Sequence, residues 1–304
     1  MRFERRLRIV QQIKPRVAIT AGDPAGIGPE IATKAAQDPG VLEVCEPRIY
    51  GPATQSDLAS FTRGRVSAAA GRAAYDAIVR AVEHASRGEV QAMATAPINK
   101  ASFAAAGLPW KGHTDLLAHL TGAPRAVMMF HSDALRVVLA TVHIPLAEVP
   151  RALTRDLVEA VVGLTASELP RFGFPSPRLA VAGLNPHAGE HGLLGSEDRD
   201  VLEPAIAACR AGGINVGGPF PADTLFLRAL RGEFDAVIAC YHDQGLIAVK
   251  MAAFGKAVNV TLGLPIIRTS VDHGTAFDIA GQGTADAGSM IEAVKLAARL
   301  VNAR

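Results

Sequence analysis

Three polar side chains in the last quarter of the sequence have the chemistry of a phosphate site. Lys250, Asn259 and Arg268 lie nine residues apart, a spacing that fits neither the helical nor the strand period. Tertiary folding must therefore bring them together if they act together. An ammonium, an amide and a planar guanidinium suit a small phosphate monoester. We expect them to bind a phosphorylated substrate, the alternative being two surface cations and a turn asparagine.

Three histidines each follow an apolar, strand-like run: His143 after LRVVLATV, His187 after RLAVAGLNP, and His242 after AVIACY. Ligands of open α/β sheets bind beyond the carboxyl ends of the strands, so the three imidazoles could meet around one ion. Three neutral imidazoles leave coordination positions open, as in a catalytic metal site. Their spacing matches no short zinc motif, and each histidine alone is as readily a hydrogen-bonded loop residue.

The elements that must position these side chains are short apolar runs that alternate with longer helical stretches. Such alternation is typical of an α/β fold with a largely parallel sheet. The expected strands have the sequences VAIT, RIYG, AMAT, AVMMF, LRVVLATV, RLAVAGL, AVIAC and VNVTL. The expected helices begin near residues 29 and 100 and cover 68–86, 155–172, 197–211 and 287–301.

Composition excludes several classes of protein. A chain of 304 residues with 49% hydrophobic and 20% charged residues can bury a large core and form two domains. Its net charge of +2, with mixed signs throughout, disfavours nucleic acid or a membrane surface as partner. Three isolated cysteines indicate a reducing, cytoplasmic location. No apolar run is long enough to span a membrane, and the first fifteen residues suggest a frayed helical extension rather than a secretory signal.

Eight motifs, in order along nearly the whole chain, resemble one family. They are GDPAGIGPE (22–30), ATAPINK (94–100), GHTDLL (112–117), TVHIPL (141–146), GLNPHAGE (183–190), PADTLF (221–226), YHDQGL (241–246) and LGLPIIRTSVDHGTA (262–276). Together they resemble the 4-hydroxythreonine-4-phosphate dehydrogenase (PdxA) family of the vitamin B6 pathway, which is related to the isocitrate and isopropylmalate dehydrogenases.

The resemblance implies a fold of two α/β/α domains with the catalytic cleft between them. It implies that residues 14–112 and 255–304 form a terminal domain on the cofactor side. Residues 113–254 would form a middle domain that carries the metal site and the dimer interface. A conventional Rossmann fold is not expected, because Gly22, Gly26 and Gly28 form GxxxGxG rather than GxGxxG.

The family's metal ligands fall on His143, His187 and His242, where they hold a divalent ion (zinc, magnesium or cobalt) shared across a homodimer interface. Asp243 and Asp223 are the expected catalytic carboxylates, and either could instead orient a metal-bound histidine as a hydrogen-bond acceptor. A helix cap or a surface turn explains each aspartate nearly as well, and the general base stays open.

The family's substrate-binding positions fall on Lys250, Asn259 and Arg268 and on the pair His113 and Thr114. For Thr114, a role in starting a helix is equally credible.

The related dehydrogenases place the adenosine half of NAD against a loop that matches His273, Gly274 and Asp278. A carboxylate there would repel a 2′-phosphate, so Asp278 favours NAD over NADP.

The activity that the resemblance implies is NAD-dependent oxidation of 4-phosphooxy-L-threonine at its 3-hydroxyl. Decarboxylation would then yield 3-amino-2-oxopropyl phosphate. Paralogues of the family act on phosphorylated D-threonate or D-erythronate, and a distant branch oxidises a dihydrodiol of terephthalate. The segment between Gly51 and Gly71 is shorter than usual in the family, which bears on the exact substrate. A metal-dependent phosphatase and a metabolite-binding module are the alternatives from other classes.

Overall fold

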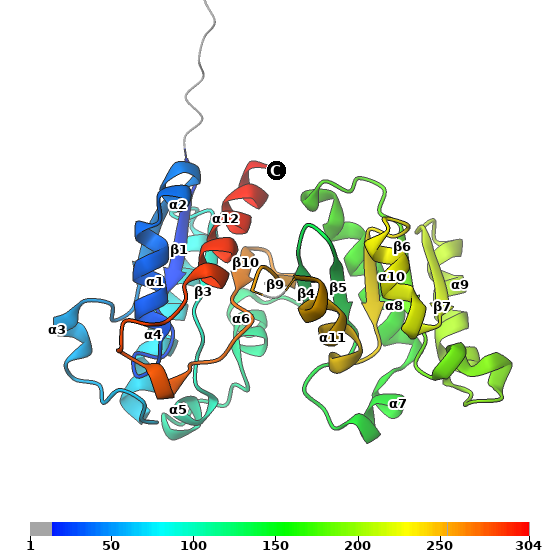
Figure 1. Cartoon of the computed structure of the whole chain (residues 1–304), viewed down its shortest axis with the longest axis horizontal. Helices are drawn as coiled ribbons and strands as arrows, with labels where there is room; N and C mark the ends of the chain where they lie inside the picture. The colour runs from blue at the N-terminus through cyan, green and yellow to red at the C-terminus, as the bar shows by residue number, and fades with distance from the viewer. Residues whose placement is uncertain (1–13, 254, 304) are drawn as a thin grey trace, which may run out of the picture.

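The computed structural model describes residues 14–253 and 255–303, and one ten-stranded sheet runs through the whole molecule (Figure 1). The strand order is β2-β1-β3-β10-β9-β4-β5-β8-β6-β7. Most of the predicted N-terminal extension lies outside the described residues. The strands are β1 (Arg16–Thr20), β2 (Glu46–Tyr50), β3 (Ala92–Thr95), β4 (Val127–His131), β5 (Arg136–Leu139), β6 (Leu179–Ala182), β7 (Val216–Phe220), β8 (Ala236–Ala239), β9 (Val258–Leu262) and β10 (Ile267–Ser270).

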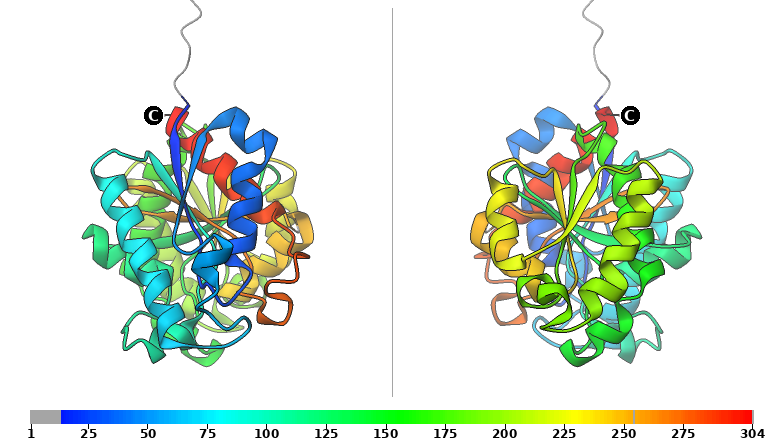
Figure 2. Two further views of the ribbon diagram at one scale, coloured as in Figure 1. Left: turned by 90° about the vertical axis from the view of Figure 1, so that its left-hand side faces the viewer. Right: turned by 90° about the vertical axis from the view of Figure 1, so that its right-hand side faces the viewer.

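Helices cover both faces of the sheet at each end of the molecule (Figure 2). The α-helices are α1 (Gly28–Gln37), α2 (Pro39–Val44), α3 (Gln55–Leu58), α4 (Ala68–Ser86), α5 (Lys100–Ala105), α6 (His113–Thr121), α7 (Val149–Ala152), α8 (Arg155–Glu168), α9 (Glu203–Ala211), α10 (Ala222–Leu230), α11 (His242–Ala253) and α12 (Gly288–Asn302). Short helical turns are η1 (Leu146–Glu148), η2 (Leu169–Phe172), η3 (Pro186–Gly192), η4 (Asp198–Leu202) and η5 (Phe277–Ile279).

Local sequence signals explain where the helices begin and end. Helix α4 occupies the predicted span because the Ser67 side chain caps it, accepting a hydrogen bond from Ala70 N. Its apolar residues recur every three or four positions and are buried. Helix α8 stops short of residue 172 and continues as the turn η2, which contains Pro170. Proline has no N–H for the helical ladder, so it favours such a break.

The predicted α/β fold is confirmed, with a junction of antiparallel strands at its centre. Both ends of the sheet are parallel: β1 pairs with β2 and β3, and β8 pairs with β5 and β6. In between, β9 runs antiparallel to β10 and to β4, and β4 is antiparallel to β5. The chain therefore leaves the first half of the sheet, completes the second half, and returns through β9 and β10.

The hydrophobic core is continuous along the sheet on one side only. One cluster of buried side chains extends from β1 and α12 in the first half to α8 and α9 in the second. The remaining core is divided into a cluster under α10 and α11 and another under α4, α5 and α6. Interrupted packing of this kind leaves room for a cleft between the two halves.

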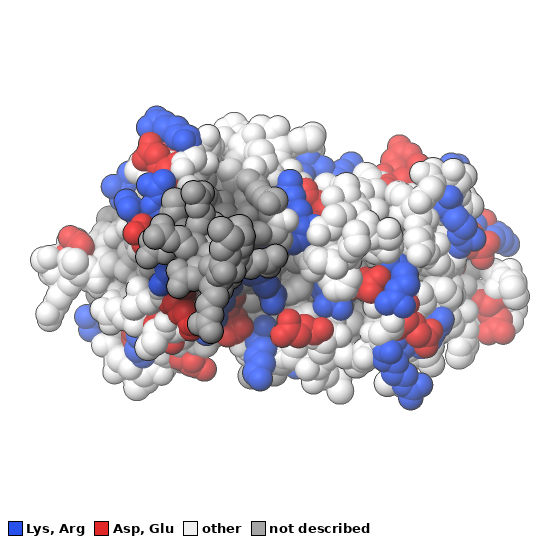
Figure 3. All heavy atoms as spheres, turned by 90° about the horizontal axis from the view of Figure 1, so that it is seen from above, with Lys and Arg blue, Asp and Glu red and all other residues white. Residues whose placement is uncertain are grey.

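Helix α6 packs with the first half, since Leu116 and Leu117 are buried in the same cluster as Phe103 and Met93. We propose that the chain divides into a terminal and a middle domain, with the first boundary after α6 rather than at residue 112. No helix in the described part of the chain combines the length and apolar character that a membrane span needs. Outside the grey atoms, the face in Figure 3 shows charges of both signs interspersed.

Candidate active site

A cleft of about 950 Å³ lies where the two halves of the sheet meet. Its walls include the N-terminal turn of α6 and one face of α11, and its floor includes β9, β10 and the end of β4. Nine of the predicted site residues line this single cleft: His113, Thr114, His143, His242, Lys250, Asn259, Arg268, His273 and Gly274. The structure thus brings together residues that are separated by up to 161 positions in the sequence.

Arg268 reaches the cleft because it alternates with core residues along β10. Its neighbour Ile267 is buried in the continuous core, and successive strand residues face opposite sides of a sheet. The Arg268 side chain is only 2% exposed. It donates from Nη1 to Thr261 Oγ1 over 2.9 Å and from Nη2 to Thr95 Oγ1 over 2.6 Å.

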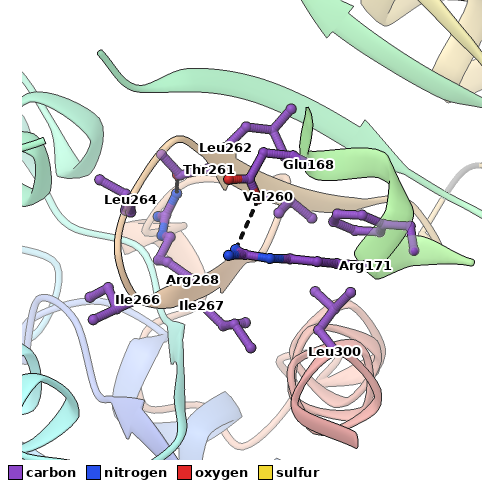
Figure 4. Close-up of a pocket in the computed structure, with 11 residues that line it drawn as sticks. Glu168, Arg171, Val260, Thr261, Leu262, Leu264, Ile266, Ile267, Arg268 and Leu300 are labelled. Atoms are coloured by element: carbon purple, nitrogen blue, oxygen red, sulfur yellow. Dashed lines mark hydrogen bonds and ion pairs between the residues drawn. The ribbon is translucent and has the colours of Figure 1, made fainter. Parts of the chain in front are cut away.

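No carboxylate pairs with the Arg268 guanidinium among the described residues, and its buried Nε has no hydrogen-bond partner. Figure 4 shows the small cavity beside it, where Arg268 turns towards Thr261 while Glu168 is already paired with Arg171 at 3.0 Å. Burial lowers the pKa of Arg268 to about 9, because removing a cation from water disfavours the charged form. A buried cation without a counter-ion is the arrangement that an anionic ligand completes.

Two more buried polar atoms of the cleft have no partner, Nε2 of His113 and Oδ1 of Asn259. Asn259 lies opposite Phe130 of β4 and Ser270 of β10. Burial, and then the charge of Arg268, holds the pKa of His113 well below its usual value, so its imidazole is neutral at pH 7. Buried polar atoms without a hydrogen-bond partner are typical of a ligand-binding site, because leaving them unpaired costs free energy that a bound ligand can offset.

The start of α6 is built by Asp115 rather than by Thr114. Asp115 Oδ1 accepts from Gly112 N over 2.8 Å, and its other carboxylate oxygen accepts from Lys111 N. Thr114 makes no such capping bond and lines the cleft. The backbone of the GHTDLL motif is therefore fixed by its own aspartate, which leaves the histidine and threonine side chains available to a ligand.

His143 and His242 face each other at the mouth of the cleft, with ring centroids 5.6 Å apart. Burial, and then the charge of Lys100, lowers the pKa of His143. His242 Nδ1 lies 2.7 Å from Asp243 Oδ1. Because an ionised carboxylate only accepts, a neutral ring in this contact carries its proton on Nδ1 and its lone pair on Nε2. These are the tautomer and carboxylate partner typical of a metal-bound histidine.

His187 and Asp223 lie apart from the cleft. His187 is on η3 after β6, and Asp223 is exposed at the start of α10 after β7. Strands β5, β8, β6 and β7 are neighbours and parallel, so all three predicted metal histidines follow the same edge of the sheet. Within the described part of one chain, however, no three histidine, cysteine or carboxylate side chains are grouped closely enough to hold an ion.

Lys250 lies on α11 and is exposed at the cleft, as is His273 on the other side. Asp278, on η5, is exposed and does not line the cleft. A neighbouring hollow of about 300 Å³ is lined by the GDPAGIGPE motif, the segment before α4, and Gly281 and Gly283. The short segment between Gly51 and Gly71 closes over this hollow, because Arg63 Nη1 donates to Gly281 O over 2.9 Å.

Sequence reasoning missed several residues of the cleft. Lys100 follows β3 and faces the same space as His143, and Asp272 and Trp110 also line it. Thr95 and Thr261 hold the Arg268 guanidinium. Lys100 could have been found, since it ends the ATAPINK motif, but a threonine on a buried strand gives no signal in the sequence.

Comparison with known proteins identifies the family to which this chain belongs. The family model described as pyridoxal phosphate biosynthetic protein PdxA matches residues 11–297. The chain belongs to the PdxA family. It is 46% identical to 4-hydroxythreonine-4-phosphate dehydrogenase of Desulforapulum autotrophicum, with 94% of this chain and 95% of that protein covered. The resemblance found from the eight motifs is confirmed, and with it the class of enzyme, an oxidoreductase.

Other members of the PdxA family are similar to nearly the same degree. D-threonate 4-phosphate dehydrogenase of Salmonella typhimurium is 44% identical, covering 93% of this chain and 98% of that one. The crystal structure of 4-hydroxythreonine-4-phosphate dehydrogenase from Klebsiella pneumoniae superimposes with a TM-score of 0.85 at 40% identity, covering 95% of this chain and 98% of the other. The fold is thus that of the family over almost its full length.

Proposed function

We propose that this PdxA-family protein oxidises 4-phosphooxy-L-threonine (4-hydroxythreonine 4-phosphate) with NAD. C3 loses its hydrogen as a hydride to the nicotinamide, and the hydroxyl on C3 loses a proton to the site. The resulting β-keto acid then loses carbon dioxide to leave 3-amino-2-oxopropyl phosphate. The observation that carries the proposal is the buried, carboxylate-free guanidinium of Arg268 in the same cleft as His143 and His242. It supports a phosphorylated substrate held beside a metal site.

Arg268, Asn259 and Lys250 would bind the phosphate group. Each brings a different donor: a planar guanidinium, an amide whose orientation a ligand can set, and a mobile ammonium on α11. The dianion would neutralise the buried guanidinium that no protein carboxylate partners. His113, neutral and with its Nε2 unpartnered, would hydrogen-bond the substrate beside Thr114.

The residues at the cleft mouth fit a divalent ion. The neutral His143 and the Asp243-oriented His242 present the nitrogen donors that zinc and cobalt prefer, whereas magnesium prefers oxygen donors. A bound divalent ion would favour loss of the proton from the substrate hydroxyl, which makes hydride transfer easier. Asp243 would act by holding the Nδ1 proton of His242. Asp223 is the second candidate for a catalytic carboxylate.

We further propose that the metal site is completed between two copies of the chain, in a homodimer. Large apolar side chains are exposed beside each predicted ligand. Leu146 follows His143 and is 66% exposed, and Ile247 and Met251 on the helix that His242 begins are 61% and 84% exposed. Leu193, six residues after His187 in the sequence, is 79% exposed. Large exposed apolar side chains are typical of a protein interface, and the dimer would supply the third histidine that one chain lacks at the cleft.

For the cofactor, His273 and Gly274 at the cleft edge would border the nicotinamide dinucleotide, with Asp278 further along the same loop. We propose NAD rather than NADP because an exposed Asp278 carboxylate would repel a 2′-phosphate. An Asp278→Ala variant should accept NADP better than the unchanged enzyme, and an unaltered cofactor preference would refute this assignment.

A second candidate is oxidation of 4-phospho-D-threonate or 4-phospho-D-erythronate. It is favoured by the near-equal similarity to a D-threonate 4-phosphate dehydrogenase, 44% against 46% for the 4-hydroxythreonine enzyme. The three substrates share the phosphate and the hydroxyl, so the contacts described above serve all of them.

The test is a side-by-side kinetic comparison of the three substrates, with NAD and a divalent ion, followed by the absorbance of NADH. The highest kcat/KM is expected with 4-phosphooxy-L-threonine. A higher value with either sugar acid would move the assignment to the second candidate. Release of inorganic phosphate without NADH would instead indicate a phosphatase.

A further inference from the structure

The segment that carries His187 has a backbone conformation that few sequences adopt. Residues 187–191 all have positive φ, with values of 52°, 54°, 79°, 45° and 57°. They form one turn of left-handed helix, and Gly189 is the only glycine in it. For a residue with a Cβ, the left-handed conformation is less stable than the right-handed one by about 1–2 kcal/mol, and it normally occurs at single positions. Strain of this size persists only where surrounding contacts hold it, and it gathers at functional sites.

One buried carboxylate holds the segment that leads into this turn. Asp198 is 1% exposed. Its Oδ1 accepts from Leu184 N over 2.8 Å, and its Oδ2 accepts from Asn185 N over 3.1 Å and from Asn185 Nδ2 over 2.9 Å. Three N–H groups therefore converge on Asp198, and charge-assisted bonds of this kind are the strong ones. They fix the chain two residues before His187.

Close packing removes the remaining freedom of the turn. A Cβ added to Gly183 would lie 2.8 Å from Ala188 Cα and 3.0 Å from Asp198 Oδ1. A Cβ at Gly195, whose φ is +117°, would lie 2.6 Å from Asn185 Nδ2. Asn185 is also held from the other side, since its Nδ2 donates to Glu197 Oε2 over 2.8 Å. The turn thus closes directly onto the segment that contains Asp198.

The His187 ring itself is exposed, and no hydrogen bond to it is found within the described part of the chain. Its direction is therefore set by the backbone of the left-handed turn rather than by a partner of the imidazole. Asp198 also begins η4, a single turn of π-helix, and such turns occur frequently at functional sites.

We propose that Asp198, assisted by Asn185, is a positioning residue that holds the left-handed turn and thereby presents His187 to the divalent ion. The inference rests on the proposed role of His187 as a metal ligand. Replacing Asp198 by asparagine turns one acceptor into a donor that faces N–H groups, so the turn relaxes and His187 moves away from its ligating position.

The test measures Co²⁺ affinity and the visible Co²⁺ absorption spectrum of the full-length protein. Asp198→Asn should weaken Co²⁺ binding by about 10–100-fold, the usual effect of losing a residue that orients a ligand, and should alter the spectrum. Stabilisation by inorganic phosphate should be unchanged, because Arg268 and Asn259 lie in the cleft. Asp200→Asn is the matched control: Asp200 is exposed and pairs with Arg199, and its loss should change Co²⁺ affinity less than about two-fold.

Two further variants separate the inference from the proposed function. His187→Ala that still binds Co²⁺ as the unchanged protein does would overturn the metal role of His187, and with it the inference. Loss of Co²⁺ in His187→Ala but wild-type affinity and spectrum in Asp198→Asn would overturn only the positioning role. If Asp198→Asn does not fold, Asn185→Ala is measured instead. That variant should weaken Co²⁺ binding several-fold, and unchanged binding would overturn the inference.

Discussion

Replacing Arg268 by methionine should make the ligand-free protein more stable. The fall in the pKa of Arg268 from 12.5 to about 9 corresponds, at about 1.4 kcal/mol for each pH unit, to a penalty of about 5 kcal/mol on the charged form. Methionine removes that penalty and leaves the hydroxyls of Thr95 and Thr261 without their donor, which costs about 3 kcal/mol together. The net expectation is a gain of about 2 kcal/mol in the free energy of unfolding.

In the presence of phosphate, the unchanged protein should become more stable than the Arg268→Met variant. At a phosphate concentration of about one hundred times Kd, binding stabilises the unchanged protein by about 2.7 kcal/mol, and the methionine variant loses that response. Urea unfolding with and without inorganic phosphate should therefore give curves that exchange their order. Arg171→Met is the control, because Arg171 pairs with Glu168 in the same region and its loss should leave the phosphate response intact. If Arg268→Met is less stable than the unchanged protein by the same amount in both conditions, Arg268 is a structural residue and the argument fails.

Three other outcomes follow from the geometry. Asp243→Asn should weaken Co²⁺ binding by about ten-fold or more, because the amide no longer fixes the proton on His242 Nδ1; unchanged affinity in equilibrium dialysis would contradict this. Met251→Asp should shift the sedimentation coefficient to that of a monomer and weaken Co²⁺ binding, whereas Arg87→Asp, on an exposed turn of the first half, should do neither. Burial and the charges of Arg299 and Arg136 lower the pKa of His131 to about 4, so as the pH falls from 6.5 the imidazole is protonated in the unfolded chain before it is protonated in the folded protein. The free energy of unfolding should therefore fall by about 3 kcal/mol between pH 6.5 and pH 4. In His131→Gln, which keeps an acceptor for Arg299, urea unfolding should show a smaller fall over the same pH range.

The fold was largely accessible from sequence because its elements are locally consistent. The apolar spacing and the Ser67 cap specify α4 to the residue, and short runs rich in apolar residues mark β3, β8 and β9 as strands. Strands β7 and β10 were not among the expected strands. The residues of β7, VGGPF, include two glycines and a proline, which are depleted in strands, and β10, IRTS, is short and mostly polar. The antiparallel junction was also missed, since the direction of a strand depends on connections that periodicity does not encode.

Some residues of the site could be predicted from their chemical type, whereas others could be found only from the tertiary structure. Arg268 could be found because the two isoleucines before it make a fully solvated arginine unfavourable. The structure shows how it is held: two threonine hydroxyls accept its hydrogen bonds, and no carboxylate among the described residues pairs with it. The left-handed turn at His187 could not be found, because four of its five residues carry a Cβ and give no sign of positive φ. Its conformation depends on Asp198, eleven residues later, and on the absence of side chains at Gly183 and Gly195. Phosphate recognition thus relies on a residue that is costly to bury, and placement of the metal ligand relies on a backbone that is costly to fold. Contacts from neighbouring segments stabilise the buried arginine and the left-handed turn. Because these contacts are different, a single substitution can remove one of them, and its effect can be measured without disturbing the other.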